Sequence, residues 1–376
     1  MPVSPESGVV VGLATGDDRP PETASPSLQA KRRFLCSASA YPGIRQQPSC
    51  VQTHMSWLFF VGEQVLKLKK PVRFPFLDFS TLQAREFYCR EELRLNSRLA
   101  PGVYLGLLAL QSGAAGLTLL PEDRLPAAGR TVDWLVWMRR LPRQRNLQHL
   151  IRKGHARADD VEAVAGVLAA FYQRAQRVSV GAAEYLGRFE REQAANREVL
   201  LRPQFQLRDA DRILDRFDAL LTRRAPLLNE RAAGGHLRDG HGDLRPEHVY
   251  LIAPPVVIDC LEFNAELRQV DPVDELSFLG LECALAGAAW VGPHLTATCA
   301  EALGQPLPPA PLIALYTARR ALLRSRLSMA HLLDQRPRTP RKWPVLAQAY
   351  LDAAAAALDA ADAKAAVTAA TSRGTP

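Results

Sequence analysis

A short stretch in the second half of the chain, DGHGDLRPEHVYLI, is rich in side chains that could do chemistry. Its charged and imidazole residues lie just before an apolar run typical of a strand. They include His241, Asp243, Arg245 and His248. Phosphoryl transfer needs such a set: a carboxylate that positions the acceptor hydroxyl, metal ions that bridge phosphates, and cations that neutralise developing charge. The alternative is that Asp243 is an ordinary turn residue.

In the phosphoryl-transfer interpretation each side chain has its own role. Asp243 accepts the proton of the acceptor hydroxyl, and Arg245 contacts the transferred phosphoryl group. A second acid, Asp259, ends the apolar run in VVIDCLEFN and is expected to hold Mg²⁺. Either Glu247 or His248 can also face the metal, and His248 is the preferred partner of Asp259. The alternatives stay open: a surface ion pair for Arg245, a strand-end cap for Asp259 and a structural hydrogen bond for His248. His241 is expected to brace the loop.

The first part of the chain predicts a small, mostly antiparallel sheet with one helix. SWLFFVGEQVLKLKK favours a strand, a turn at Gly62-Glu63 and a second strand that puts Lys67 and Lys69 on one face. STLQAREFYCREELRLNSRLA predicts a helix of about twenty residues with Ser80 as its N-cap. VYLGLLAL and TVDWLVWMRRL predict two further strands.

The second part predicts mainly helices, at residues 159–176, 182–201, 209–221 and 311–335. The acids Asp271 and Asp274 are expected to cap and brace a further helix. An Ala-rich helix follows a basic connector that contains prolines. The predicted divisions are a mostly disordered lead (1–45), an N-lobe (46–138), a helical C-lobe (139–336), and the connector with the C-terminal helix (337–376).

Composition narrows the classes of partner. The 376 residues carry a net charge of +8, but the basic residues are scattered, so nucleic-acid binding is not expected. The first residues lack the features of a secretory signal, and no apolar run is long enough to span a membrane. The six cysteines form no C-x-x-C pair. These features favour a cytoplasmic protein with reduced cysteines and no membrane partner.

The sequence HGDLRPEH resembles the catalytic loop H-G-D-x-x-x-x-N of the aminoglycoside phosphotransferase-like small-molecule kinases, within the protein-kinase-like superfamily. The resemblance implies an α+β, two-lobed fold with a small antiparallel-sheet N-lobe and a larger, mainly helical C-lobe. It implies that Lys67 contacts the phosphates of ATP, with Glu92 as its ion-pair partner and Lys69 as its rival. Met138, in VWMRRL, falls where the family's hinge meets adenine.

The resemblance extends over much of the chain, from about residue 53 to about residue 326. THMSWLFFVGEQVLKLKKPVRFPFLDFST, LRLNSRLAP and IDCLEFN are similar to a little-characterised bacterial branch of the family. Two departures stand out. His248 replaces the family's metal-binding Asn, which favours Mn²⁺ over Mg²⁺ or weakens the site. No Gly-rich loop precedes the lysines, so Thr53, His54 and Ser56 are expected to offer donors to phosphate instead.

Three functions follow in order of preference. The first is an ATP-dependent phosphotransferase that acts on a hydroxyl of an unidentified small molecule, with Mg²⁺ or Mn²⁺. The second is a nucleotide-binding pseudokinase with a regulatory or scaffold role. The third is a metal-dependent hydrolase with four candidate ligands: His236, His241, Asp243 and His248.

Other polar residues have weaker interpretations. Glu262 and Asn264 could add a metal ligand or a substrate contact. Arg320 and Arg324 lie on one helix face, where pairing with acids is preferred over binding an anionic substrate. The sequence does not fix the oligomeric state.

Overall fold

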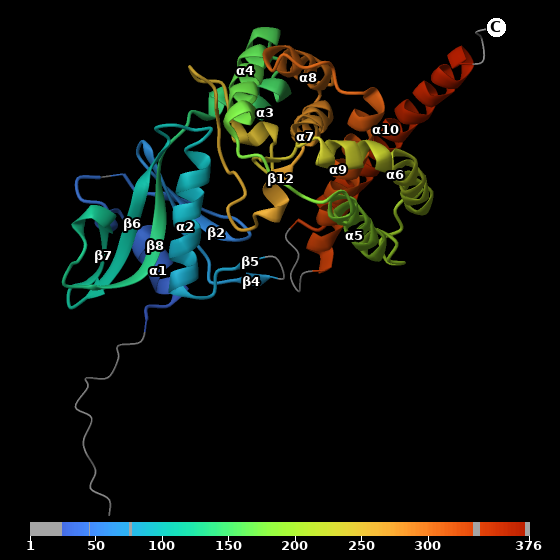
Figure 1. Ribbon diagram of the computed structural model, residues 1–376. Helices are drawn as coiled ribbons and strands as arrows, with labels where there is room; N and C mark the ends of the chain where they lie inside the picture. Colours follow the sequence, from blue (N-terminus) through green and yellow to red (C-terminus); the bar gives the residue numbers. More distant parts are fainter. Residues whose placement is uncertain (1–24, 45, 75–76, 334–338, 373–376) are drawn as a thin grey trace, which may run out of the picture.

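Two lobes of different composition make up the part of the chain that the structure describes (Figure 1). The computed structural model describes residues 25–44, 46–74, 77–333 and 339–372. One lobe is built on a β-sheet, and the other consists mostly of helices. The predicted α+β, two-lobed fold is confirmed.

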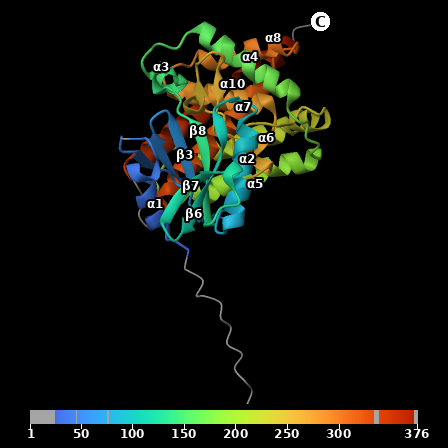
Figure 2. The same cartoon turned by 90° about the vertical axis from the view of Figure 1, so that its left-hand side faces the viewer.

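An antiparallel sheet of six strands forms the smaller lobe, in the order β1-β2-β3-β8-β6-β7 (Figure 2, where this lobe faces the viewer). The strands are β1 (Ser49–Gln52), β2 (Ser56–Val61), β3 (Gln64–Lys69), β6 (Tyr104–Gly113), β7 (Gly116–Pro121) and β8 (Arg130–Arg139). Between β2 and β3, Gly62 has a φ of +56°, a left-handed conformation that glycine adopts without steric cost. A short hairpin of β4 (Arg73–Phe74) and β5 (Leu77–Asp78) extends from this lobe toward the helical lobe (Figure 1).

Helices α1 (Leu28–Leu35) and α2 (Leu82–Asn96) cover opposite faces of the sheet. Leu35 and Cys89 are buried in separate clusters, which contain alternate residues of the same strands. Because α2 packs on the inner face, its polar residues can meet β3 and the helical lobe.

The predicted disordered lead over 1–45 is too long, because its last part is folded. Residues 1–24 lie outside the described residues, but α1 and a 3₁₀ turn at Ala38–Ala40 belong to the folded lobe. A disulfide joins Cys36 to Cys50 of β1. The expectation of reduced cysteines is therefore wrong for this pair.

The start of α2 differs by one residue from the prediction. Thr81, not Ser80, is the N-cap, and its hydroxyl accepts a hydrogen bond from the N–H of Ala84. The N–H and hydroxyl of Ser80 instead donate to Asp78, which closes the preceding turn. Both residues are good caps, so the sequence alone did not choose between them.

The larger lobe consists mainly of helices. They are α3 (Leu147–Arg152), α4 (Ala158–Arg174), α5 (Ala182–Leu200), α6 (Ala210–Ala233), α7 (Pro272–Leu285), α8 (Val291–Ala302), α9 (Ala310–Ala330) and α10 (Lys342–Ser372). α7 is central, because its residues contribute to both hydrophobic clusters of this lobe. Asp271 caps α7 by accepting from the N–H of Val273, as predicted. Within the described ranges, no helix combines the length and apolarity needed to cross a membrane.

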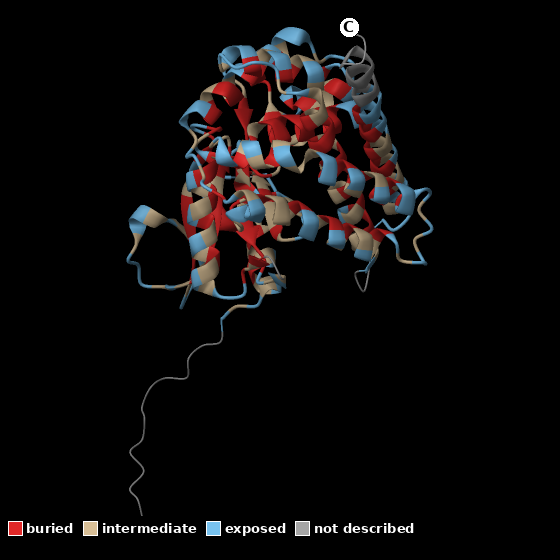
Figure 3. Cartoon of the chain, turned by 45° about the vertical axis from the view of Figure 1, so that its right-hand side comes forward, coloured by how far each residue is buried: buried red, intermediate tan, exposed pale blue. Residues whose placement is uncertain are grey.

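Two helices differ in extent or role from the prediction. α6 continues past residue 221 and through Pro226, because Leu228 and Ala232 extend its buried stripe. α10 is an integral part of the helical lobe rather than a separate tail. Its buried residues, which include Ala347, Tyr350, Leu351 and Ala354, belong to the larger cluster together with residues of α9. Figure 3 shows that the described helices of the chain have both buried and exposed faces.

Two pairs of short strands flank the segments that contain the two candidate catalytic acids, Asp243 and Asp259. β9 (Arg238–Asp239) pairs with β12 (Gln269–Val270), and β10 (Val249–Tyr250) pairs with β11 (Val256–Val257). The loop that contains Asp243 connects β9 to β10, and β11 leads to Asp259. The two pairings therefore bring both acids to the same side of the helical lobe.

Candidate active site

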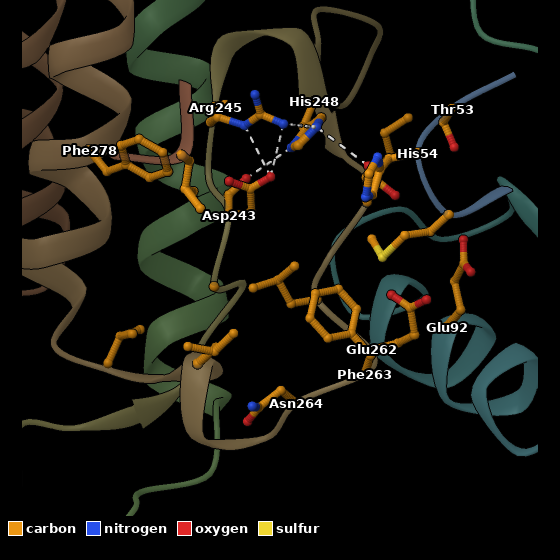
Figure 4. A pocket seen from close by; sticks show the side chains of 18 of the residues that line it. Thr53, His54, Glu92, Asp243, Arg245, His248, Glu262, Phe263, Asn264 and Phe278 are labelled. Atoms are coloured by element: carbon orange, nitrogen blue, oxygen red, sulfur yellow. Dashed lines mark hydrogen bonds and ion pairs between the residues drawn. The ribbon is translucent and has the colours of Figure 1, made fainter. Parts of the chain in front are cut away.

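A cavity of about 880 Å³ lies between the two lobes. Of the residues predicted for the site, all but Lys69 line it: Lys67, Glu92, Met138, Asp243, Arg245, His248 and Asp259. Figure 4 shows that the labelled side chains come from both lobes, with Glu92 on one side and Asp243 and Arg245 on the other.

Lys67, on β3, lies between two carboxylates from distant parts of the chain. Its ammonium donates to Glu92 Oε1 at 2.7 Å and to Asp259 Oδ1 at 3.0 Å. Glu92 is buried on α2, so these bonds connect the sheet, the helix and the segment after β11. Lys67 holds the pKa of Asp259 well below its usual range, and Asp259 is therefore ionised.

Lys69 also contacts Glu92, but it does not reach the cavity. It donates to Glu92 Oε2 at 2.6 Å and to Glu262. Its side chain is 0% exposed, whereas that of Lys67 is 14% exposed. A buried lysine with both partners engaged has no access to a phosphate, so the geometry speaks against a cofactor contact for Lys69. Instead, Lys69 ties α2 to the segment that follows Asp259.

The loop that carries Asp243 is anchored by a buried carboxylate of α7, Glu275. The N–H groups of His241 and Gly242 donate to Glu275 Oε1 at 2.8 Å and 2.5 Å. Gly242 has a φ of +86°, and a Cβ there would lie 2.9 Å from Leu261 Cδ1. Glycine is therefore required at this position. Sequence reasoning missed Glu275, because a carboxylate within an apolar helix gives no sign of what it holds.

His241 connects the two acid-bearing segments. Its Nε2 donates to the carbonyl oxygen of Ile258 at 2.9 Å, and its Nδ1 accepts from the N–H of Asp243 at 3.3 Å. Burial, with the neighbouring His248, lowers the pKa of His241 to about 4. The ring is thus neutral at neutral pH, and its role is the bracing that the sequence predicts.

Arg245 is folded back onto Asp243 (Figure 4). Its Nε and Nη2 lie 3.0 Å and 2.9 Å from Asp243 Oδ2, and its Nη1 lies 2.5 Å from Glu247 Oε1. Burial acts to raise the pKa of Asp243, but the charges of Arg245 and His248 outweigh it and lower this pKa. Asp243 is consequently an ionised acceptor. A contact between Arg245 and a phosphoryl group would require the guanidinium to release at least one acid.

His248 presents its Nε2 to Asp259. Its Nδ1 donates to the carbonyl oxygen of Asp243 at 2.9 Å, so in the neutral ring Nε2 is the unprotonated nitrogen. This nitrogen lies 3.5 Å from Asp259 Oδ2 and 3.3 Å from Arg245 Nη2. A carboxylate oxygen beside an imidazole lone pair suits Mn²⁺ and, less well, Mg²⁺. The pair fits a divalent cation that also takes oxygen ligands from phosphate and water.

The ligand set drawn for a hydrolase is not assembled. His236 lines a separate cavity, behind β9 and α7, and not the one that contains Asp243. No group of three or more His, Cys, Asp or Glu side chains suited to a metal ion occurs in the part of the chain that the structure describes.

An apolar slot adjoins the end of β8. Its residues come from three strands of the sheet lobe and from the β10–β11 region: Leu58, Phe60, Val65, Met138, Tyr250 and Ile258. A flat, apolar slot of this kind suits a nucleobase. Met138, for which the sequence predicts an adenine contact, is part of this lining.

The turn between β1 and β2, where the sequence predicts donors to phosphate, borders the cavity. Thr53 Oγ1 accepts from the N–H of Ser56, and the ammonium of Lys70 donates to the carbonyl oxygens of Thr53 and His54. The His54 ring stacks on Phe74. Thr53, His54 and Ser56 all line the cavity, as expected, but side-chain contacts rather than glycines set the shape of this turn.

Arg320 and Arg324 of α9 pair with acids, which is the interpretation that the sequence favours over binding of an anionic substrate. Arg320 makes two bonds of 2.8 Å to Asp274, and Arg324 donates to Glu282 at 3.1 Å. Asn264 also lines the cavity.

A further wall of the cavity was not predicted. It is formed by α5 and α9, and its arginines include Arg188, Arg319 and Arg326. The run ARRALLRSR was the one available signal, and it shows only that α9 is basic.

Comparison with known sequences finds relatives without an established function. No profile of a known protein family matches the chain. Uncharacterised proteins of Mycobacterium tuberculosis and Mycobacterium bovis are 31% identical to it over 291 residues. The matched part covers 76% of this chain and 55% of each relative, so the chain spans about half the length of the curated relatives it matches.

Comparison with solved structures identifies the fold. The choline kinase of Cryptosporidium parvum has a TM-score of 0.50 at 10% identity, over 88% of this chain and 96% of that chain. A choline/ethanolamine kinase family protein of Mesorhizobium loti has a TM-score of 0.48 at 14% identity, over 89% of this chain and 98% of that one. The chain has the two-lobed, protein-kinase-like fold of small-molecule kinases, as its sequence predicts.

Proposed function

We propose that the chain is an ATP-dependent phosphotransferase that transfers the γ-phosphoryl group to a hydroxyl of a small molecule. The observation that carries this proposal is the convergence of Lys67, Glu92, Asp259 and Asp243 on one cavity. These residues come from four separate segments, and phosphoryl transfer uses this combination of one cation and several carboxylates.

Each residue has a role that its contacts support. Lys67, oriented by Glu92, contacts the phosphates of ATP, and the apolar slot around Met138 takes the adenine. Asp243, ionised and fixed on a loop held by Glu275, orients the acceptor hydroxyl and accepts its proton. Arg245 leaves Asp243 and offsets charge on the γ-phosphoryl group.

Asp259 and His248 would hold a divalent cation, Mg²⁺ or Mn²⁺. When bound, such a cation neutralises charge on the phosphate oxygens. Lys67 already occupies Asp259 Oδ1, which leaves Oδ2 and the His248 Nε2 on the same side. Asp259 is also 48% exposed at its side chain, so water can complete the ligand set.

Calorimetric titration with a non-hydrolysable ATP analogue, in Mg²⁺, in Mn²⁺ and in EDTA, tests the proposal. Binding that requires either cation is the expected result. Absence of binding under all three conditions would overturn the proposal. Lys67→Met serves as the site variant, and Lys153→Met, at an exposed position after α3, serves as its control.

A nucleotide-binding pseudokinase is the second candidate, and one observation favours it. Arg245 covers the Asp243 carboxylate, and His248 replaces the Asn of the family motif. Binding of the analogue without any cation, together with no phosphoryl transfer, would favour this candidate over the first.

A further inference from the structure

The wall of the cavity formed by α5 and α9 is rich in arginine. Six arginines line it: Arg188, Arg191, Arg319, Arg320, Arg324 and Arg326. Beside them, outside the catalytic loop, the lining of this part contains three carboxylates: Glu192, Glu266 and Asp274. Two further carboxylates, Glu184 and Glu282, pair with Arg188 and Arg324. The six arginines thus exceed these five carboxylates by one, and the excess favours an anion in the adjoining space.

The groups that could bind a cationic acceptor are already engaged by arginines. Arg319 binds Glu192 and Asp274, with N···O distances of 2.8 Å to each. Its guanidinium also covers the Phe189 ring at 4.5 Å, and that of Arg320 covers the Phe278 ring at 4.9 Å. An ammonium group needs free carboxylates or open ring faces, and here arginines occupy both.

Arg326 differs from the other five arginines. Its Nε donates to Asn196 Oδ1 at 2.8 Å, and it has no carboxylate partner among the residues that the structure describes. Its side chain is half-buried. Burial, with the neighbouring charge of Arg319, lowers the pKa of Arg326, although the carboxylates of Glu192 and Glu198 act in the opposite direction. A half-buried guanidinium that makes no direct ion pair is a suitable partner for an anion from outside the chain.

Arg326 and Asp243 line the same cavity. Arg324 is close enough to Asp243 for its charge to lower the pKa of that carboxyl. Arg326 lies two residues further along α9, so its side chain leaves the helix about 200° around from that of Arg324, yet both side chains line the cavity. A small molecule that fills this part of the cavity can contact Arg326 and present a hydroxyl to Asp243.

We infer that the acceptor is an anionic hydroxyl compound, whose carboxylate or phosphate group binds Arg326. This inference rests on the proposed phosphotransferase function. The acceptor oxygen forms a bond to the γ-phosphorus of ATP, and the bond from that phosphorus to the β–γ bridging oxygen breaks. The hydroxyl proton passes to Asp243, and ADP leaves.

Three sugars of equal skeleton and different charge test this inference. Glucuronate, glucose and glucosamine are titrated into the protein with and without a saturating non-hydrolysable ATP analogue and Mg²⁺. We expect glucuronate to bind at least about tenfold more tightly than glucosamine, since one charge-assisted contact is worth that factor. Glucose 6-phosphate, in a fourth titration, distinguishes a phosphate site from a carboxylate site.

Variants at one position make the test specific. Arg326→Gln should abolish the preference for glucuronate, and Arg326→Glu should shift it toward glucosamine. Arg326→Lys, which keeps the charge, should retain part of the preference if the fold is intact by thermal unfolding. Arg212→Gln, at an exposed position on α6, is the matched control and should change nothing.

Several results would overturn the inference. They are equal or tighter binding of glucosamine, no binding of either anionic sugar at tens of millimolar, and a preference that survives in Arg326→Gln. Failure of the proposed function gives a different pattern, because the nucleotide analogue then does not bind while the titrations without nucleotide still report on the arginine wall.

Discussion

The two halves of the cavity have opposite charge arrangements. On the proposed nucleotide side, two lysines pair with three carboxylates: Lys67 at the cavity and Lys69 beneath it, against Glu92, Asp259 and Glu262. On the other side, the arginines of α5 and α9 outnumber the carboxylates that line the same wall. In the first half the carboxylates are paired with lysines around Asp259, and in the second half the arginines exceed the carboxylates that line the wall.

This difference matches the two partners that a phosphotransferase brings together. A metal ion with its nucleotide suits the side with spare carboxylate oxygens. An acceptor with a negative group suits the side where Arg326 lacks an acid. The comparison also separates residues that act on ligands from residues such as Lys69, which act only on other parts of the chain.

The largest expected effect is at the point where the halves meet. Asp243→Asn keeps the size of the side chain but removes its charge, so it cannot accept the hydroxyl proton. We expect phosphoryl transfer to fall by roughly 10³-fold, with nucleotide affinity nearly unchanged. Turnover and calorimetric titration measure the two quantities. Asp159→Asn, whose side chain is 83% exposed, is the control. A loss of only a few-fold would contradict the role of Asp243.

The two lysines of β3 should respond differently to the same substitution. Lys69→Met leaves Glu262 and one oxygen of Glu92 buried without a partner, so the free energy of unfolding should fall by about 3–5 kcal/mol. Lys67→Met should destabilise less, because Asp259 can be solvated, but should weaken nucleotide binding at least about tenfold. Denaturant unfolding and calorimetric titration of both variants test this. Equal effects on stability and on binding would remove the distinction.

The nucleotide side was largely predictable from the sequence because its residues lie in compact local patterns. Asp243, Arg245 and His248 fall in one loop, and strand alternation puts Lys67 and Lys69 on a common face. The pattern could not choose between the lysines, since both share that face. The structure distinguishes the two lysines, because the side chain of Lys69 is fully buried and paired with Glu262.

The arginine wall could not be predicted in the same way. Arg319 and Arg326 belong to α9, whereas Glu192 and Asn196 belong to α5, more than a hundred residues earlier. Each helix alone shows an ordinary polar face. Which arginine meets an acid depends on how the helices pack, and α9 is fixed by α10, whose role the sequence did not reveal.

A smaller effect concerns the cation on the nucleotide side. His248→Asn replaces an imidazole nitrogen with an amide oxygen, which is a better ligand for Mg²⁺. We expect the ratio of activity in Mg²⁺ to activity in Mn²⁺ to rise several-fold. The ratio is the useful quantity, because losing the hydrogen bond from His248 to Asp243 affects both conditions alike. An unchanged ratio would mean that His248 does not contact the cation.

The smallest effect concerns the support beneath the loop that both halves share. Burial raises the pKa of Glu275, which accepts from the N–H groups of His241 and Gly242 and from the Tyr172 hydroxyl. A carboxyl whose pKa is higher in the folded state stabilises the fold fully below its unfolded pKa. That contribution is lost as the pH rises through the folded pKa.

Glu275→Gln keeps an acceptor for the backbone but cannot ionise. The variant should therefore gain stability relative to the wild type as the pH rises from about 5 to 8. Urea unfolding at a series of pH values measures this difference. A difference that stays constant, or that moves in favour of the wild type, would show that the ionised carboxylate is the better anchor. In that case Glu275 would be ionised, and its negative charge would act on Asp243 at the boundary between the two halves of the cavity.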